Sequence, residues 1–184
     1  MISDQTYVDK PKNNPAAVVT TLFFFAGFYF MVASMNLYDV VAMPLSTALL
    51  LWIVPGFVAY PFLVKQASFS KIKTPMGKFL ALTLINIIAF GSLVLYTVLA
   101  VDFYKAPGTP VSTVKYVIVG TGNLGKKYRP LPFADIIYKN GLKRFTFSGD
   151  SITLSNIINY RYIQLSVTPG YLGYDVIKGV NLVR

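Results

Sequence analysis

The stretch that decides the fold is 79–101, which reads FLALTLINIIAFGSLVLYTVLAV and contains no charged side chain. At a rise of about 1.5 Å per residue, a helix of this length covers the roughly 30 Å hydrocarbon layer of a bilayer. A helix on the surface of a soluble core carries a polar face towards water, and this stretch has no such face. The sequence therefore predicts a transmembrane helix here.

Two further apolar segments precede it, at 16–35 and at about 40–64. Only 13% of all residues are charged, whereas soluble domains contain about 25%. The first segment is longer than the apolar part of a signal peptide, and no small-residue cleavage site follows, so we expect it to be retained. We predict a tail at 1–14 and a three-helix transmembrane region over 15–104.

Three residues of these segments predict particular contacts. Asn86 is the most polar side chain of the third segment, and an amide at this depth can hydrogen-bond across helices. We interpret it as a candidate interhelix contact, to a partner helix or a ligand; the alternative is a bond within the chain to Thr83, Ser92 or a backbone carbonyl. Pro55 predicts a bend in the second segment. Trp52 lies near the middle of that segment, so we expect it to pack against a neighbouring helix.

The charges that flank the segments predict the orientation. Lys10 and Lys12 precede the first segment, and four lysines lie between the second and third segments, whereas the loop after the first segment carries Asp39. Short cationic loops stay on the cytoplasmic side. We expect a bacterial cytoplasmic membrane (the cell inner membrane), with the N-terminus in the cytoplasm and all residues after Asp102 outside it.

A linker at 105–110 leads to a small β-rich domain at 111–184. Short apolar runs between turn residues predict strands near 114–119, 133–138, 142–148, 160–168 and 171–177. Asn140-Gly141 predicts a type I′ hairpin turn, and Pro169-Gly170 a second tight turn. A short helix is predicted around 154–158. The predicted fold class is membrane α-helical, with three transmembrane helices and a small β-rich α+β C-terminal domain.

Residues 120–125 read GTGNLG and match the G-x-G-x-x-G pattern of dinucleotide-binding loops. That site needs a helix directly after the third glycine, because the helix N-terminus binds the pyrophosphate. Pro130 and Pro132 follow too closely for such a helix, and the expected acidic residue is not in place. We interpret the stretch as a glycine-rich loop and predict no cofactor.

The chain is poor in groups for catalysis, because it has no cysteine, no histidine and no glutamate. Disulfides, thiolate metal sites and cysteine nucleophiles are therefore excluded. Without histidine, the usual general base near neutral pH and the commonest metal ligand are missing. We predict no catalytic residue, no metal and no enzymatic activity; the alternative is a membrane enzyme that uses aspartate and lysine alone. The acidic groups are Asp4, Asp9, Asp39, Asp102, Asp135, Asp150 and Asp175.

A cluster of basic side chains in the C-terminal domain is a candidate interaction patch. It could contact anionic headgroups, an acidic protein or a phosphorylated ligand; the alternative is a solvated basic loop. Nucleic acid is not expected, because no recognisable binding module is present. The patch consists of Lys126, Lys127, Arg129, Lys143 and Arg144.

These features predict a non-enzymatic integral membrane protein that acts as an accessory or regulatory subunit. Its partners are the lipid bilayer and, through the C-terminal domain, another membrane or extracytoplasmic protein. The alternative is a component of an oligomeric channel or carrier, which leaves a homo-oligomer open. Pumps and proton-coupled carriers need a charged group at membrane depth, and the three segments contain none. The accessory role is therefore the leading hypothesis.

Overall fold

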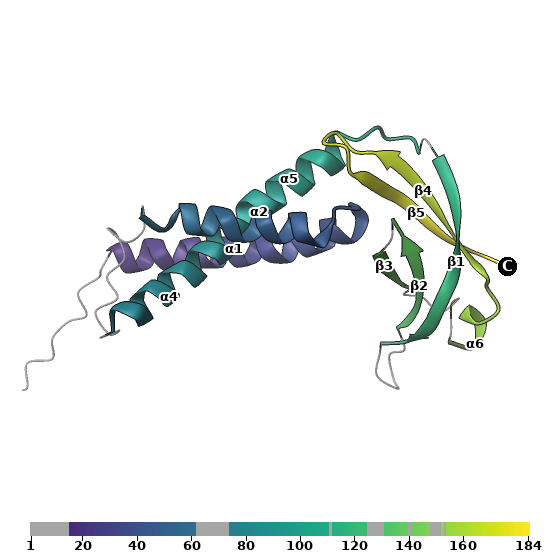
Figure 1. The fold of residues 1–184 in the computed structure, drawn as a ribbon, viewed down its shortest axis with the longest axis horizontal. Coiled ribbons are helices and arrows are strands. Elements are labelled where there is room, and N and C mark those ends of the chain that lie inside the picture. Colours follow the sequence, from purple (N-terminus) through teal and green to yellow (C-terminus); the bar gives the residue numbers. More distant parts are fainter. Residues whose placement is uncertain are drawn as a thin grey trace, which may run out of the picture. The chain divides into compact units, whose positions relative to one another are not determined.

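The computed structural model describes residues 15–61, 74–110, 112–124, 131–139, 141–147, 152 and 154–184 (Figure 1). The chain divides into two units, and each is described by itself. The helical unit consists of Met1–Met35 and Pro44–Val98, and the sheet unit consists of Asn36–Met43 and Leu99–Arg184.

The helical elements are α1 (Pro15–Val40), α2 (Leu45–Val58), α4 (Pro75–Asn86), the π-helical segment η1 (Ile87–Gly91) and α5 (Ser92–Tyr104). The last three form one continuous helical stretch. Compared with the predicted segments, α1 extends further, to Val40, and α2 begins later, at Leu45. Proline explains the break, because Pro44 has an extended ψ of 139° and disfavours helical backbone in the residue before it.

The third helical stretch begins at a capped proline. The Thr74 hydroxyl oxygen accepts a hydrogen bond from the backbone N–H of Gly77 at 3.2 Å, and Pro75 occupies the first helical position. Proline is tolerated there because its missing N–H has no partner inside a helix. The helix therefore starts one turn before the predicted position 79 and includes Lys78.

In the described part of the chain, two helices are long and apolar enough to cross a membrane. They are residues 18–40 of α1 and the continuous stretch 75–104; α2, with 14 residues, is shorter. Of the most apolar window in each, 11% and 28% of the residues are buried. The core helix of a soluble protein is mostly buried, so these helices differ from such a core helix.

Three glycines bring the helices of the helical unit close together at η1. A side chain at any of them would overlap the backbone of a neighbouring helix. Small residues allow this close approach in helix pairs that lack a hydrophobic driving force. Gly27 of α1 lies against Ala89, Gly56 of α2 lies against Ile87, and Gly91 of η1 lies against the Trp52 carbonyl of α2.

Hydrogen bonds between helices accompany these contacts. The Trp52 indole N–H donates to the Ser92 hydroxyl at 3.0 Å. The Ser34 hydroxyl donates to the Phe30 carbonyl at 2.7 Å and lies 3.5 Å from the Ser92 carbonyl. The prediction that Trp52 packs against a neighbouring helix is confirmed.

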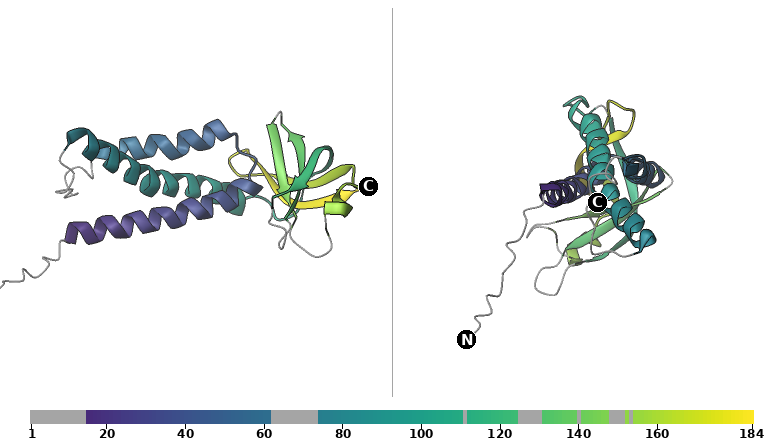
Figure 2. Two further views of the ribbon diagram at one scale, coloured as in Figure 1. Left: turned by 90° about the horizontal axis from the view of Figure 1, so that it is seen from below. Right: turned by 90° about the vertical axis from the view of Figure 1, so that its left-hand side faces the viewer.

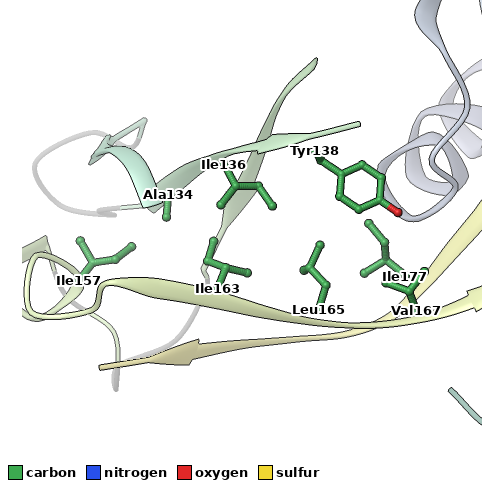
Figure 3. Close-up of a cluster of buried hydrophobic side chains, with 8 residues drawn as sticks. All are labelled: Ala134, Ile136, Tyr138, Ile157, Ile163, Leu165, Val167 and Ile177. Atoms are coloured by element: carbon green, nitrogen blue, oxygen red, sulfur yellow. The ribbon is translucent and has the colours of Figure 1, made fainter. Parts of the chain in front are cut away.

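The sheet unit contains five antiparallel strands in the order β3-β2-β1-β4-β5 among the described residues. The sheet curls, so that β2 and β4 face each other across the core (Figures 2 and 3). The prediction of a strand-rich C-terminal region is confirmed. The elements are β1 (Ser112–Asn123), β2 (Pro132–Tyr138), β3 (Gly141–Thr146), α6 (Leu154–Ile157), β4 (Tyr162–Pro169) and β5 (Asp175–Val183).

The core of the sheet unit lies on the inner face of the curled sheet (Figure 3). Alternate residues of β2 and β4 point into it, as the twofold repeat of a strand requires. Its buried side chains are Ala134, Ile136, Tyr138, Ile157, Ile163, Leu165, Val167 and Ile177.

The hairpin between β2 and β3 differs from the prediction by one residue. Tyr138 pairs with Gly141, so Gly141 belongs to β3 rather than to the turn, and Asn140 lies outside the described residues. Lys139 has the positive φ of 45° that the first position of this turn needs. The observed register keeps Phe145 on the inner face opposite Ala134, and a slip of one residue would turn it outwards.

The turn between β4 and β5 is also longer than predicted. Pro169 pairs with Asp175, so residues 170–174 form the connection, and the predicted strand 171–177 begins too early. The cause lies outside the local sequence. Asp102, fully buried near the end of α5, accepts a hydrogen bond from the Leu172 backbone N–H at 2.5 Å, and Gly170 lies against its carboxylate.

A segment from the end of α1 also belongs to the sheet unit. Val41 forms a β-bridge with Val176 of β5, and the Ala42 backbone N–H donates to the Asp175 carbonyl at 2.7 Å. Val41 is 1% exposed. The sheet unit therefore includes the C-terminal residues of both long helices.

The glycine contacts at η1 predict the effect of one methyl group. Gly91→Ala should reduce stability by at least about 1–3 kcal/mol, because overpacking forces backbone to move. The measurement is thermal unfolding of the full chain in mild detergent. Gly108→Ala is the control, since a Cβ there meets nothing within 4 Å. Equal melting temperatures for the two variants would contradict the close packing.

Candidate functional site

The apolar runs of β1 and β2 show no alternation with polar residues. Residues 116–119 read YVIV, and residues 136–138 read IIY. Because successive side chains of a strand point to opposite faces, such runs place apolar groups on both faces of the sheet. Tyr116 and Ile118 pack against the core, whereas Val117 and Val119 point outwards and are 61% and 53% exposed.

The strand register aligns outward apolar side chains into one line across the sheet, which we call the outer row. Residues directly opposite each other in antiparallel strands lie on the same face. Ile137 and Leu142 are such a pair and are 58% and 69% exposed. Ile118 pairs with Ile136 in the antiparallel strands β1 and β2, so the preceding residue, Val117, lies opposite Ile137. In strand order, the outer row is Leu142, Ile137, Val117, Tyr162 and Val183.

Beside the outer row, Arg144 of β3 forms a two-bond ion pair with Asp135 of β2. Its Nε and Nη2 donate to the two carboxylate oxygens, each at 2.8 Å. The guanidinium also lies 3.8 Å from the centre of the Phe133 ring. A planar pair of this kind is directional, so Arg144 is held in place. Its charge is already balanced by Asp135.

The Phe133 ring explains why residue 122, the second glycine of the G-x-G-x-x-G pattern, has no side chain. A Cβ on Gly122 would lie 2.6 Å from the ring. Gly122 pairs with Phe133, so the ring covers the position that a side chain would take. Gly120 and Gly122 both lie within β1, which runs to Asn123, and not in a glycine-rich loop as the sequence suggested. Gly125 lies outside the described residues.

The structure does not bring the two described members of the predicted basic patch together. Lys143 and Arg144 are consecutive in β3, so they point to opposite faces. Lys143 is paired with the buried Ile136 on the inner side, and burial lowers the pKa of its ammonium, partly offset by Asp39. Lys126, Lys127 and Arg129 lie outside the described residues, so the complete patch stays a prediction.

Asn86, the candidate interhelix contact, is fully buried at the last residue of α4. Neither polar atom of its amide has a hydrogen-bond partner among the described residues, and the same is true of the Thr83 hydroxyl. Among the described residues, the alternative of a bond to Thr83, Ser92 or a backbone carbonyl is therefore not seen; Ser92 instead accepts from Trp52. A contact of Asn86 with a partner helix or a ligand stays a prediction.

Three aspartates of the sheet unit have partners that fix local structure. Asp102 holds the turn 170–174, Asp135 binds Arg144, and Asp175 binds Lys139 at 2.6 Å. No group of three or more His, Cys, Asp or Glu side chains that could hold a metal occurs in the described part of the chain. The sheet unit thus presents a hydrogen-bonded sheet surface with a line of exposed apolar groups.

Sequence reasoning did not identify the outer row. The signal was present in the non-alternating runs of β1 and β2, but the pairing of strands that are distant in sequence decides which side chains align. A comparison with protein-family models, curated proteins and solved structures finds no match.

The Asp135–Arg144 pair predicts a pH dependence. The hydrogen bond from Arg144 lowers the pKa of Asp135 below its usual 3.8, against the smaller raising effect of burial. A carboxylate with a lowered pKa stabilises the fold above its unfolded pKa, and this contribution is lost as the pH falls through the folded pKa.

Asp135→Asn should therefore be less stable than the wild type at pH 7, and the difference should shrink as the pH falls below 3.8. Urea unfolding in detergent, followed by circular dichroism at pH 7 and pH 3, measures it. A difference that is the same at both pH values would show that the pair does not act through the ionised carboxylate.

Proposed function

We propose that this chain is an integral membrane protein with three transmembrane helices, and that its sheet unit docks a partner protein as an accessory or regulatory subunit. The observation that supports docking is the outer row, in which three neighbouring positions, Leu142, Ile137 and Val117, are each more than half exposed. Apolar groups aligned on a rigid face are typical of protein interaction sites.

The exposed side chains of the helical unit support the membrane assignment. Leu22 and Phe25 of α1 are both 64% exposed, and Leu84 of α4 is 60% exposed. Leaving such a side chain in water instead of an apolar environment costs roughly 1.5–3 kcal/mol. Lipid removes this cost, because its tails are as apolar as the side chains.

The connectivity supports three crossings. The C-terminal ends of α1 and α5 both lie in the sheet unit, so both long helices run towards the same side. The chain between them must return to the opposite side. The 14 residues of α2 cover about 21 Å, less than the hydrocarbon layer, but the apolar sequence continues to Val64. The second segment supplies the return crossing.

The lysines that flank the apolar segments support an orientation of the chain in the membrane. The lysines before α1 and between 65 and 78 hold these parts in the cytoplasm of a bacterial cell, which places the sheet unit outside the cytoplasmic membrane. An enzyme reporter fused after Arg184 should therefore be active if it works in the extracytoplasmic space. High activity of a reporter that works in the cytoplasm would overturn this orientation.

The docked partner is a protein with an apolar centre and an acidic rim. The sheet unit contains eleven basic residues and five aspartates, so its charge favours an acidic surface. Lys115, which is exposed on β1 two residues before Val117, adds a cation beside the outer row. Contacts of this kind at the rim weaken as salt screens them.

The test compares two isoleucines of similar exposure. Ile137, in the outer row, is 58% exposed, and Ile158, after α6, is 68% exposed. Crosslinking in intact membranes, followed by purification in mild detergent, should capture an acidic partner with the wild type and with Ile158→Ser. Ile137→Ser should lose most of it.

Equal capture by both variants would contradict docking through the outer row. Purified protein in proteoliposomes separates the alternative role as an oligomeric channel or carrier component. Robust solute flux by the protein alone would support that role and defeat the accessory one.

A further inference from the structure

A small pocket opens at one end of the curled sheet, separate from the outer row. It lies where β1 and β5 begin and where β2 and β4 end, on the inner side of the sheet. Its volume is about 110 Å³. A water molecule in the liquid takes about 30 Å³, so the pocket has room for about four non-hydrogen atoms. The residues that decide its chemistry are Tyr116, Tyr138, Asp175, Val114, Val167 and Thr168.

Two tyrosine rings form one side of this pocket. Tyr116 of β1 and Tyr138 of β2 lie with ring centres 5.4 Å apart and planes tilted by 54°. Tyr138 is at the end of the row of core side chains, opposite Val167 and Ile177 (Figure 3). Aromatic rings attract cations through their negative faces, and organic ammonium groups are the usual ligands of such pairs.

Asp175 supplies a fixed negative charge beside the rings. Its Oδ2 accepts from the Tyr138 hydroxyl at 2.8 Å and from the Lys139 ammonium at 2.6 Å. Burial raises the pKa of Asp175, but these two bonds outweigh burial and hold the pKa below 3.8. The carboxylate is therefore ionised at neutral pH. Its Oδ1 accepts no hydrogen bond from the described residues and is left for a further donor.

Lys139 shows that this carboxylate binds an ammonium group. The lysine is the first residue of the β2–β3 turn, and its side chain is 56% exposed. An exposed ion pair of this kind contributes little to stability, so an incoming ammonium group can replace Lys139 or add at Oδ1. In the same sheet unit, the other described ion-paired carboxylate, Asp135, lies on the opposite face and has no free oxygen.

We propose that this pocket binds a small organic ammonium group, with Asp175 as the counter-ion and Tyr116 and Tyr138 as the aromatic wall. Ethanolamine, with four non-hydrogen atoms and an ammonium group that donates hydrogen bonds, has the required size and charge. The ammonium group belongs either to a lipid headgroup or to a free amine. Binding of a lipid headgroup rests on the proposed function, because that proposal puts the end of the sheet unit next to Val41 and Asp102 at the membrane surface. Binding of a free amine does not depend on the proposed function.

The experiment titrates ethanolamine hydrochloride into the full chain in an amine-free detergent and follows binding by saturation-transfer nuclear magnetic resonance. Sodium chloride at the same ionic strength is the reference. Saturable binding of an amine that sodium does not compete away is expected. Asp175→Asn should weaken it by at least about tenfold, because a hydrogen bond to a charged group is lost. Lys139→Ala should tighten it by about two- to fivefold, because the resident ammonium is removed.

Two further variants protect the interpretation. Asp135→Asn removes an ion-paired carboxylate outside the pocket and should leave amine binding unchanged. Val114→Trp fills the pocket from a position that is 40% exposed, and should abolish binding while the circular dichroism spectrum stays that of the wild type. Absence of saturable binding in the wild type, or equal binding by the wild type and Asp175→Asn, would overturn the proposal.

Nanodiscs distinguish the two sources. If a lipid headgroup occupies the pocket, ethanolamine should bind more weakly in phosphatidylethanolamine discs than in phosphatidylglycerol discs. Equal affinity in both would identify a free amine as the ligand. Capture of the partner by the outer row involves none of the pocket residues, so failure of one proposal leaves the other in place.

Discussion

The sheet unit includes the C-terminal ends of two long apolar helices, α1 and α5, and this connection constrains the path of the chain between them. The bridge between Val41 and Val176 fixes the chain after α1, and the buried carboxylate of Asp102 fixes the end of α5 to the turn 170–174. The C-terminal residues of both helices therefore belong to the same unit. The proposal of three crossings follows from this connection, because two helices that cross a membrane and end on one side of it require the chain between them to cross back.

The helices of the helical unit meet at η1 through contacts that involve no charged side chain. Gly27, Gly56 and Gly91 let three helices meet at the π-helical segment η1, where wider side chains would push the backbones apart. Dispersion and a few hydrogen bonds, such as Trp52 to Ser92, hold the helices together while their outward faces stay apolar.

The apolar segments and most strands could be predicted, because both depend on local composition and spacing. The features that could not be predicted depend on contacts between distant residues. Asp102 sets the turn at 170–174 from seventy residues away, and the inner position of Phe145 moves the first hairpin turn to Lys139. The outer row could be predicted only from the register of every strand. The sequence instead indicated a patch of basic residues, one of which, Arg144, is already neutralised by Asp135.

The number of membrane crossings can be measured by cysteine labelling, because the chain contains no natural cysteine. Single cysteines at Gly108, after α5, and at Ser70, between the second and third segments, are labelled in intact cells with a membrane-impermeant maleimide. Three crossings predict labelling at 108 without permeabilisation, and labelling at 70 only after it. Labelling of both positions in intact cells would show that the second segment does not cross the membrane, and would contradict the proposed three crossings.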